Sequence, residues 1–455
     1  IEITSFDKNA KPGRYEVKLV ELRPATQRDR DRLVARRAFD EAEKLKTQNT
    51  RQSMETAIKK YEEALNLYRV IQDRSEQYLM LLGLGNTELE LKQWPLALER
   101  FDQCFLIAEE LKDKFRQGRA LERGEAVYIG SGEWQKALQK AAQSLQFFEA
   151  TGEKNEIALM LGEVGGIYNH LGEWEKALQR HDEALQIYQA IGDKNNEAAT
   201  LIRIGKIYND LGEYEKAREF IWPAVRIYQA LKDRNLEAEA IESIGYTYHL
   251  QEENQKALEY YLETLPIWQA LKNKRREASN LSFIAGEYGR DGDKEKAISY
   301  ATQAWQLAQA TGSKGNEATV STNVGHAYYE MGEFEKALSF YEKPLRYWQA
   351  TSNKLNEAIT HSHIAAALRD LGRLDEAKIH IEQSIALFEF IREHAGSADS
   401  QSSFVANFFE FYDLYVDVLM RLHAANPQAG NDSNALAFTE KVKLRSLLAL
   451  LAQGR

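Results

Sequence analysis

The side chains that most often carry catalysis are sparse in this sequence. Its 455 residues include one cysteine, Cys104, and nine histidines. The sequence contains an internal repeat, and alanine stands at positions equivalent to this cysteine, at Ala64 and Ala184. That substitution pattern is typical of a small core position, so we expect a buried, unreactive thiol rather than a nucleophile. A single thiol also excludes an internal disulfide and a thiolate metal cluster.

The remaining candidates for chemistry are a histidine pair and a glycine cluster. His361 and His363 are separated by a single residue, which places them on different sides of a helix, so we predict no metal site there. The glycines between Gly162 and Gly166 lack the Lys-Ser or Lys-Thr pair of a phosphate-binding loop, and we expect them to serve helix packing. The sequence therefore predicts no enzyme, no cofactor and no metal.

Charge and composition exclude several other classes. The net charge is -10, which removes the driving force for unspecific binding to nucleic acid. The sequence contains no run of about 18 uncharged apolar residues that would span a membrane. Only 7 prolines occur, which argues against a disordered chain and against a turn-rich β protein.

The elements that carry these residues recur with a period of about 40 residues. Alanine appears in register eight times, at Ala97, Ala137, Ala177, Ala217, Ala257, Ala297, Ala337 and Ala377. Twelve residues before each alanine stands a small residue in seven of the eight copies, and Glu125 is the exception. An internal repeat of this kind predicts a stacked array of similar units. At Glu125 we expect either that the helix slips by one residue or that the repeat opens locally.

Each unit has the pattern of two amphipathic helices. Leu201, Ile204 and Tyr208 follow the helical spacing of three and four, and a Leu-Gly-Glu turn ends the first helix. Gly205 and Ala217 are small enough to let the two helices approach closely. One hairpin cannot bury its apolar stripe alone, so the units must stack.

These residues resemble a known family. The pattern Leu201-x-x-Ile204-Gly205-x-x-Tyr208, followed by Ala217, Ile221 and Ala224, resembles the tetratricopeptide repeat. The unit is longer than the usual one of about 34 residues and lacks the terminal proline, like the longer repeats of kinesin light chains. The resemblance implies an all-α superhelical solenoid with eight repeats over residues 75–395, preceded by a divergent hairpin over 27–74.

A solenoid of this family binds partners on the concave face that its first helices line. We predict a groove there for a peptide or protein segment, made by Asn169, Arg203, Lys206, Asn209, Tyr246, His249, Gly286, Gly289, Arg290, His326 and Tyr329. Aromatic residues are enriched at the binding surfaces of proteins. Asn169 and Asn209 are one repeat apart and form a ladder that could hydrogen-bond an extended backbone.

The sixth repeat is the predicted centre of this groove. Gly286 and Gly289 leave bare backbone between aromatic residues of the fifth and seventh repeats, which makes a pocket for an anchor side chain. The alternative is that both glycines only relieve crowding against a neighbouring helix. The basic residues Arg203, Lys206 and Arg290 favour an acidic or polar-aromatic peptide as the ligand.

Both ends of the chain depart from the repeat. Residues 1–26 are predicted as a short β segment and linker, with a strand at 14–22. Residues 396–455 are predicted as C-terminal capping helices, over 402–424 and from 434 to about 452. Phe408 and Tyr415 lie on an apolar stripe of the first of these, and we expect both to be buried against the last repeat.

The ends also resemble bacterial proteins of the CHAT class, which are caspase-like cysteine peptidases preceded by tetratricopeptide repeats. The resemblance is carried by Gly13-x-Tyr15, the stretch 21–26 with the Arg/Asp-rich helix after it, and the stretches 412–423 and 445–448. It implies that this chain is the regulatory or sensor part of such a protease, with a covalently linked caspase-like domain after Arg455. The alternative is a free-standing adaptor with no catalytic partner domain. Both interpretations leave the cytoplasm and an exported location open.

Overall fold

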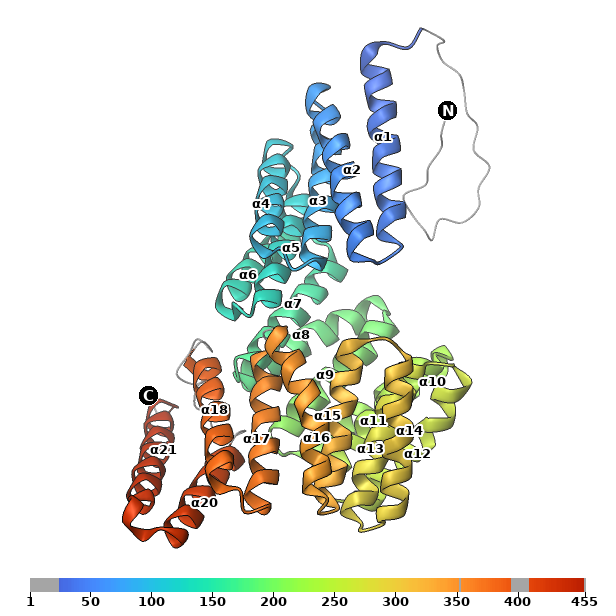
Figure 1. Ribbon diagram of the computed structural model, residues 1–455. Helices are drawn as coiled ribbons and strands as arrows, with labels where there is room; N and C mark the ends of the chain where they lie inside the picture. The colour runs from blue at the N-terminus through green and yellow to red at the C-terminus, as the bar shows by residue number, and fades with distance from the viewer. Residues whose placement is uncertain (1–23, 352, 394–408, 454–455) are drawn as a thin grey trace. The chain divides into compact units, whose positions relative to one another are not determined.

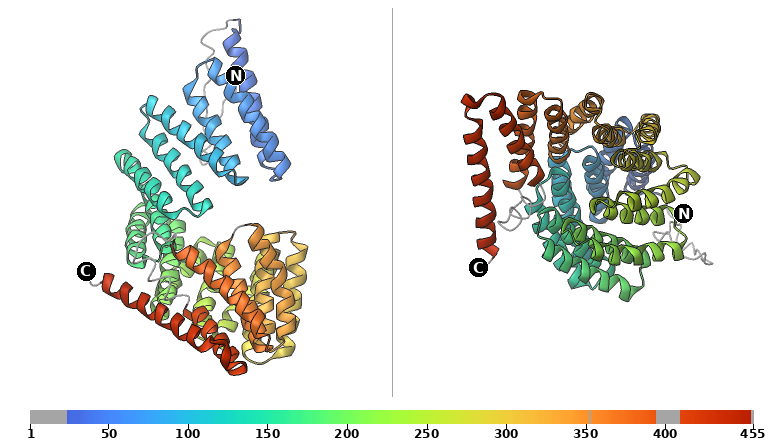
Figure 2. Two further views of the ribbon diagram at one scale, coloured as in Figure 1. Left: turned by 60° about the vertical axis from the view of Figure 1, so that its left-hand side comes forward. Right: turned by 90° about the horizontal axis from the view of Figure 1, so that it is seen from below.

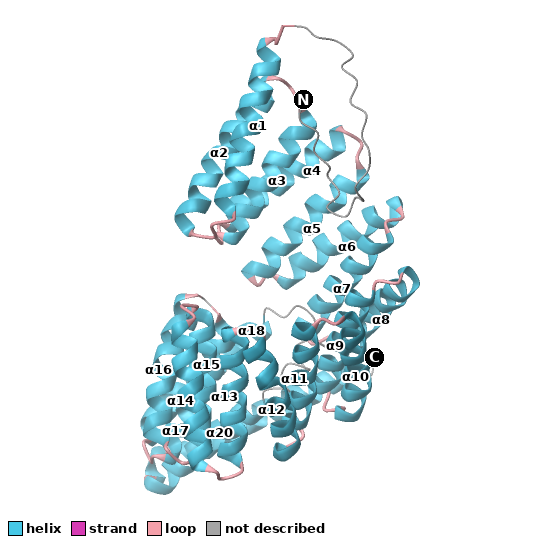
Figure 3. Ribbon diagram, turned by 90° about the vertical axis from the view of Figure 1, so that its right-hand side faces the viewer, coloured by secondary structure: helices cyan, strands magenta, loops and turns pink. Residues whose placement is uncertain are grey.

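Helices make up all the regular structure of the described part of the chain. The computed structural model describes residues 24–351, 353–393 and 409–453, which divide between Lys112 and Asp113 into two compact units (Figure 1). No strand occurs within these ranges (Figure 3). The strand predicted at 14–22 lies outside the described residues.

The first unit contains two helix hairpins. They are α1 (Gln27–Lys46) with α2 (Arg51–Val70), and α3 (Arg74–Glu90) with α4 (Trp94–Glu110). Thr26 starts α1 through a capping box with Asp29, in which each side chain accepts a hydrogen bond from the other's backbone N–H. Cys104 is fully buried in α4, and burial raises the pKa of its thiol. The predicted burial of this thiol in the core is confirmed.

The second unit continues the hairpins with a strict period. Its first helices are α5 (Lys114–Ser131), α7 (Lys154–His170), α9 (Lys194–Asp210), α11 (Arg234–Leu250), α13 (Lys274–Arg290), α15 (Lys314–Glu330) and α17 (Lys354–Asp370). Its second helices are α6 (Trp134–Thr151), α8 (Trp174–Ile191), α10 (Tyr214–Leu231), α12 (Asn254–Ala270), α14 (Lys294–Ala310), α16 (Phe334–Ala350) and α18 (Leu374–Glu393). The starts of successive first helices are separated by the period read from the sequence, so the predicted repeat and fold class are confirmed. Successive hairpins of this unit lie side by side along a curved path (Figure 2).

Small residues bring the two helices of a hairpin together, as predicted. A Cβ atom on Gly205 would lie 2.5 Å from Cγ1 of Ile221 and 3.0 Å from the carbonyl oxygen of Ala217. Gly212 has a φ of +73°, the left-handed conformation that ends α9. The short distance between the two helices of a hairpin therefore explains why a small residue stands at this position.

Glu125 fits without disturbing the repeat, so the predicted slip or opening is wrong. Helix α5 keeps the register of the repeat and packs on α6. The glycine at this position in other repeats faces a large side chain sixteen residues later, such as Ile221 or Tyr261. In this repeat the facing residue is Ala141, which leaves room for the buried glutamate.

We expect Glu125 to make the stability of the second unit depend on pH. Burial, with smaller contributions from Glu163 and Glu122, raises the pKa of Glu125 to about 8 from an ordinary value of 4.5. The folded state binds this proton more tightly than the unfolded chain does. The contribution of Glu125 to stability is therefore fully present below pH 4.5 and is lost as the pH rises through about 8.

Glu125→Gln removes this dependence because glutamine does not titrate. We expect the variant to have a higher melting temperature than the wild type at pH 9, and a difference much closer to zero at pH 5. Thermal unfolding followed by circular dichroism at both pH values measures the effect. Glu295→Gln, which changes an exposed glutamate of α14, is the control and should leave both differences small. An equal effect of Glu125→Gln at the two pH values contradicts the prediction.

Of the two C-terminal helices, the first packs on the last repeat and the second packs on the first. They are α20 (Phe409–Ala425) and α21 (Asn431–Gln453), joined by the short helix η1 (Pro427–Ala429). Tyr412, Val418 and Leu419 of α20 are buried, and the ring of Phe411 stacks on Phe388 of α18. Tyr415 is only partly buried, which corrects the predicted stripe, because its hydroxyl reaches outward to donate to Glu382. Phe408 lies outside the described residues.

Candidate functional site

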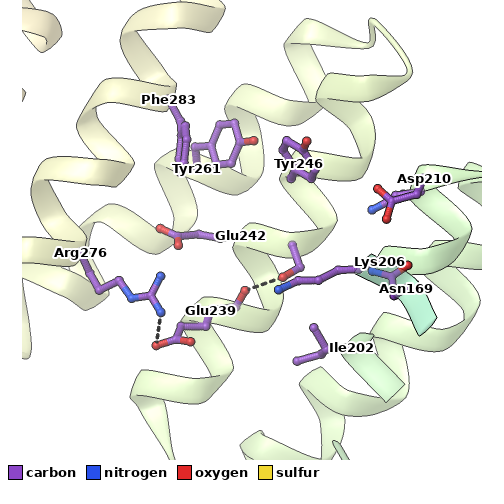
Figure 4. Close-up of a pocket in the computed structure, with 12 residues that line it drawn as sticks. Asn169, Ile202, Lys206, Asp210, Glu239, Glu242, Tyr246, Tyr261, Arg276 and Phe283 are labelled. Carbon is purple, nitrogen blue, oxygen red and sulfur yellow. Dashed lines mark hydrogen bonds and ion pairs between the residues drawn. The ribbon is translucent and has the colours of Figure 1, made fainter. Parts of the chain in front are cut away.

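Two adjoining cavities lie on the first helices of the second unit. The larger, about 440 Å³, is named here the Lys206 cavity and is lined by Asn169, Ile202, Lys206, Asn209, Asp210, Glu239, Glu242, Ser243, Tyr246, Tyr261, Arg276 and Phe283 (Figure 4). The smaller, about 280 Å³, is named the Gly286 cavity and is lined by Tyr246, His249, Tyr261, Ser282, Phe283, Gly286, Glu287, Arg290, Thr322, Asn323, His326 and His363. Because Tyr246, Tyr261 and Phe283 line both, the cavities share a wall.

Most of the predicted groove residues line one of these cavities. The Gly286 cavity brings together Tyr246, His249, Gly286, Arg290 and His326. The Lys206 cavity brings together Asn169, Lys206, Asn209 and again Tyr246. Three predicted residues line neither cavity: Arg203, Gly289 and Tyr329.

The two glycines of the sixth repeat have different roles. A Cβ atom on Gly286 would meet no heavy atom within 4 Å, so its backbone is the open floor of the cavity. A Cβ atom on Gly289 would lie 3.3 Å from the carbonyl oxygen of Ala327 in α15, so this glycine relieves crowding instead. Helix α14 lies between α13 and α15 in the sequence, and its buried side chains are all small, including Ala301 and Ala308. These small side chains allow α13 and α15 to approach each other. Gly286 therefore lies on the floor of the cavity as predicted, whereas Gly289 does not.

Arg203 and Tyr329 are engaged elsewhere. Arg203 is exposed, and its NH1 lies 3.9 Å from Oε1 of Glu163. The hydroxyl of Tyr329 donates to Oδ2 of Asp370 at 2.8 Å and accepts from NH2 of Arg369 at 3.2 Å. Burial and the Asp370 carboxylate raise the pKa of Tyr329 to about 12. Tyr329 thus joins the seventh repeat to the eighth rather than forming a cavity wall.

The asparagine ladder ties neighbouring repeats together. Nδ2 of Asn209 donates to Oγ1 of Thr247 in the next repeat at 3.0 Å. Asn169 hydrogen-bonds to Asp210, also in the next repeat. The Oδ1 atoms of Asn169 and Asn209 have no partner among the described residues. The asparagine side chains were predicted to hydrogen-bond a peptide backbone. That prediction now applies only to their Oδ1 atoms, because both side chains already hydrogen-bond within the protein.

The Gly286 cavity is aromatic and nearly neutral. Burial lowers the pKa of His326 to about 3 and that of His363 to about 4, so both rings are uncharged at neutral pH. Nδ1 of His249 lies 2.5 Å from Oε1 of Glu287 and 2.8 Å from NH1 of Arg290. A carboxylate and a guanidinium group thus contact the same ring nitrogen of His249, and the remaining surface suits an apolar or aromatic group.

The Lys206 cavity contains the more polar wall. Nε1 of Trp268 donates to Oε1 of Glu242 at 2.6 Å, and Nδ2 of Asn280 donates to the same oxygen at 2.8 Å. Burial raises the pKa of Glu242 to about 7, although both hydrogen bonds act in the opposite direction. Arg276 pairs with Glu239 at 2.7 Å, a contact visible in Figure 4.

Glu242, Asn280 and Glu287 are buried polar residues that the sequence did not single out. For two of them the repeat contains a partial signal, because a carboxylate or amide side chain is exceptional at their positions. Glu287 stands where other repeats have Thr87, Val127, Ile167, Ile207, Thr247, Ala327 and Ala367, and Asn280 stands where others have Met80, Ala120, Met160, Thr200, Ala240, Val320 and Thr360. The position of Glu242 contains no such signal, because other repeats have Glu122, Ser282, Thr322 and Ser362 there. His361 and His363 do contact different helices, since His361 meets His380 of α18 and His363 stacks on Tyr341 of α16.

Comparisons with known proteins agree with this architecture. A family model described as tetratricopeptide repeat matches residues 156–230 and 316–389, which correspond to helices α7–α10 and α15–α18. No curated protein shows significant sequence similarity to the chain. None of the described helices is long and apolar enough to cross a membrane.

Solved structures with this fold cover much of the chain. The apo form of RapI has a TM-score of 0.50 at 18% identity, over 61% of this chain and 99% of its own. A Rap protein in complex with competence and sporulation factor has a TM-score of 0.52 at 12% identity, over 81% and 99%. Aspartyl phosphate phosphatase F from Bacillus subtilis has a TM-score of 0.53 at 12% identity, over 81% and 96%. At these identities the likeness concerns the fold, and the family match identifies residues 156–230 and 316–389 as tetratricopeptide repeats.

Proposed function

We propose that the second unit is a protein-interaction scaffold that binds an extended peptide segment across its first helices, with an anchor side chain in the Gly286 cavity. The observation that carries this proposal is the bare backbone of Gly286 inside a cavity walled by Tyr246, His249 and His326. A side chain that enters such a space is desolvated on several sides at once, which is where binding free energy concentrates. The fold relative solved with competence and sporulation factor supports ligand binding by solenoids of this kind.

The cavities favour an apolar or aromatic anchor over an acidic one. The Lys206 cavity contains two cations, Lys206 and Arg276, against three carboxyl groups, Asp210, Glu239 and Glu242. The predicted basic character of this face is therefore cancelled by acidic residues from neighbouring repeats. A volume of about 280 Å³ in the Gly286 cavity is enough for one large side chain.

Selection from a library of random displayed peptides tests this function. We expect enrichment of peptides that share an aromatic or large apolar residue, and loss of their binding in Tyr246→Ala. Tyr246 is 47% exposed and lines both cavities. Trp222→Ala is the matched control, because Trp222 is a 36% exposed aromatic residue of the second helix α10, away from both cavities. Failure to enrich any peptide, or equal loss in both variants, would contradict the proposal.

The association with a caspase-like peptidase is a further part of this proposal and has its own support. That support is the resemblance of the stretches around Gly13–Thr26 and Tyr412–His423 to CHAT proteins. A scaffold that captures a peptide would then report its presence to a linked protease domain. Sequencing the gene beyond the codon for Arg455 distinguishes this arrangement from a free-standing adaptor.

A further inference from the structure

The Lys206 cavity contains a buried carboxyl group with one unused oxygen. Glu242 is 9% exposed, and its Oε1 accepts both hydrogen bonds, from Trp268 and from Asn280. Among the described residues no donor contacts Oε2, and Glu242 faces the cavity (Figure 4). Oε2 is thus an unpaired acceptor on the cavity wall, and a ligand that supplies a donor here can form a hydrogen bond with it.

The other charged groups of the cavity already compensate one another. Arg276 forms its ion pair with Glu239, and the ammonium group of Lys206 is attracted by Glu239 and Asp210. Two cations are thus matched by two carboxylates. Glu242 is the third carboxylate, and Arg276 acts on it only through longer-range attraction. The missing charge in this cavity is therefore positive.

Aromatic rings stand beside this carboxylate. Figure 4 shows Tyr246, Tyr261 and Phe283 along one side of the cavity, next to Glu242. The ring centroids of Tyr261 and Phe283 are 5.3 Å apart. Ring faces attract cations and also cover an alkyl chain, so a carboxylate beside aromatic rings suits an ammonium group on an aliphatic stem.

We propose that the Lys206 cavity binds an alkylammonium group, carried by a lysine side chain of the captured peptide, with Oε2 of Glu242 as its acceptor. This inference rests on the proposed function and names the chemistry of a second contact beside the anchor. The shared wall of Tyr246, Tyr261 and Phe283 allows one extended peptide to place its anchor in the Gly286 cavity and its lysine in the Lys206 cavity.

Binding of this group is expected to strengthen as the pH rises. The pKa of Glu242 is about 7, raised by burial and by the nearby charge of Glu239, and opposed by the hydrogen bonds from Trp268 and Asn280 and the charge of Arg276. A lysine ammonium group stays protonated up to about pH 10. The ionised fraction of Glu242 rises about tenfold between pH 6 and pH 8, and affinity for the ammonium group should rise by a similar factor.

Three small probes test the site in the intact chain. They are N-acetyl-lysine methylamide, n-butylammonium as a free amine, and N-acetyl-norleucine methylamide as a neutral control of similar length. The indole N–H of Trp268 donates to Glu242, so its NMR signal, assigned with Trp268→Phe, reports on the carboxyl group. We expect the lysine probe to shift this signal with an affinity about tenfold higher at pH 8 than at pH 6. The norleucine probe should leave the signal unchanged.

Glu242→Gln should weaken the lysine probe by about tenfold or more at pH 8 and abolish the pH dependence, because the amide N–H₂ replaces the accepting oxygen. The matched control is Glu122→Gln, which changes the glutamate at the equivalent repeat position of α5, where Glu122 pairs with Arg119. Equal binding of the lysine and norleucine probes, or unchanged binding in Glu242→Gln, overturns the inference. If n-butylammonium binds as tightly as the lysine probe, the ligand is a free amine rather than a peptide.

The outcomes also separate this inference from the function beneath it. Suppose that library peptides bind in a Tyr246-dependent way but the lysine probe does not bind. The scaffold function is then supported and the ammonium site is rejected. A lysine probe that binds, in a protein that enriches no peptide, rejects the scaffold function and leaves an amine site.

Discussion

Gly286→Trp is expected to abolish peptide capture while leaving the helices intact. Nothing lies within 4 Å of the position that its Cβ would occupy, so an indole ring at this site fills the cavity rather than distorting the helix. A peptide that loses a buried anchor typically loses at least about 2 kcal/mol, or roughly 30-fold in affinity. Binding of the selected peptides, measured by fluorescence anisotropy, gives the answer.

The same repeat position supplies a control for this substitution. Gly166 of α7 stands three repeats earlier, also has no heavy atom within 4 Å of its Cβ position, and lines neither cavity. Gly166→Trp should therefore retain peptide binding with unchanged helical content. A substitution at Gly289 does not test the cavity, because a side chain there meets the backbone of Ala327. Retention of full affinity in Gly286→Trp refutes the anchor cavity.

Trp268→Ala is expected to give the largest loss of stability. Trp268 is fully buried in α12, and its Nε1 donates to Glu242 at 2.6 Å. Truncating a buried tryptophan to alanine costs about 3–5 kcal/mol. The lost donor adds to this cost, because it leaves Glu242 with only one hydrogen bond. Urea unfolding followed by far-UV circular dichroism measures the difference.

Two further variants separate the packing of Trp268 from its hydrogen bond. Trp268→Phe keeps most of the buried volume and removes the donor, so we expect a smaller loss, about 1–3 kcal/mol. Trp222→Ala removes a partly exposed tryptophan from the neighbouring repeat and should cost less than Trp268→Ala. Similar losses in Trp268→Ala and Trp222→Ala would show that the burial of Trp268 contributes little.

The fold could be predicted from local sequence patterns that recur in every repeat. Leu201, Ile204 and Tyr208 place apolar groups on one helical face, and Gly205 marks where the partner helix approaches. Because each hairpin contacts mainly its neighbours, a pattern within one repeat predicts both the helices and their stacking. For the same reason the side of the first helices that carries Tyr246 and His326 was identifiable as a candidate binding face.

The charges of the site depended on contacts between repeats. Arg203, Lys206 and Arg290 were predicted to make this face basic, but acidic residues of neighbouring repeats also reach it. Glu239 of the fifth repeat, for example, pairs with Arg276 of the sixth. The pKa of Glu242 depends on its burial, and its hydrogen bonds come from the second helix of its own repeat and the first helix of the next. Residue types in sequence order therefore indicated a basic face, whereas the folded face is close to neutral.

The sequence by itself determined the helices, their pairing and the side of the first helices on which the candidate binding residues lie, because these depend on periodicity and on contacts within one hairpin. Only the tertiary structure decided which glycine is a floor and which is a contact. Both stand at positions of α13 that were predicted to face the groove, but the alanines of α14 let α15 come against Gly289, which is buried, and Gly286 stays open. The spacing of neighbouring repeats follows from the side-chain volume packed between them, and that volume is set by three helices together rather than by any one stretch of sequence.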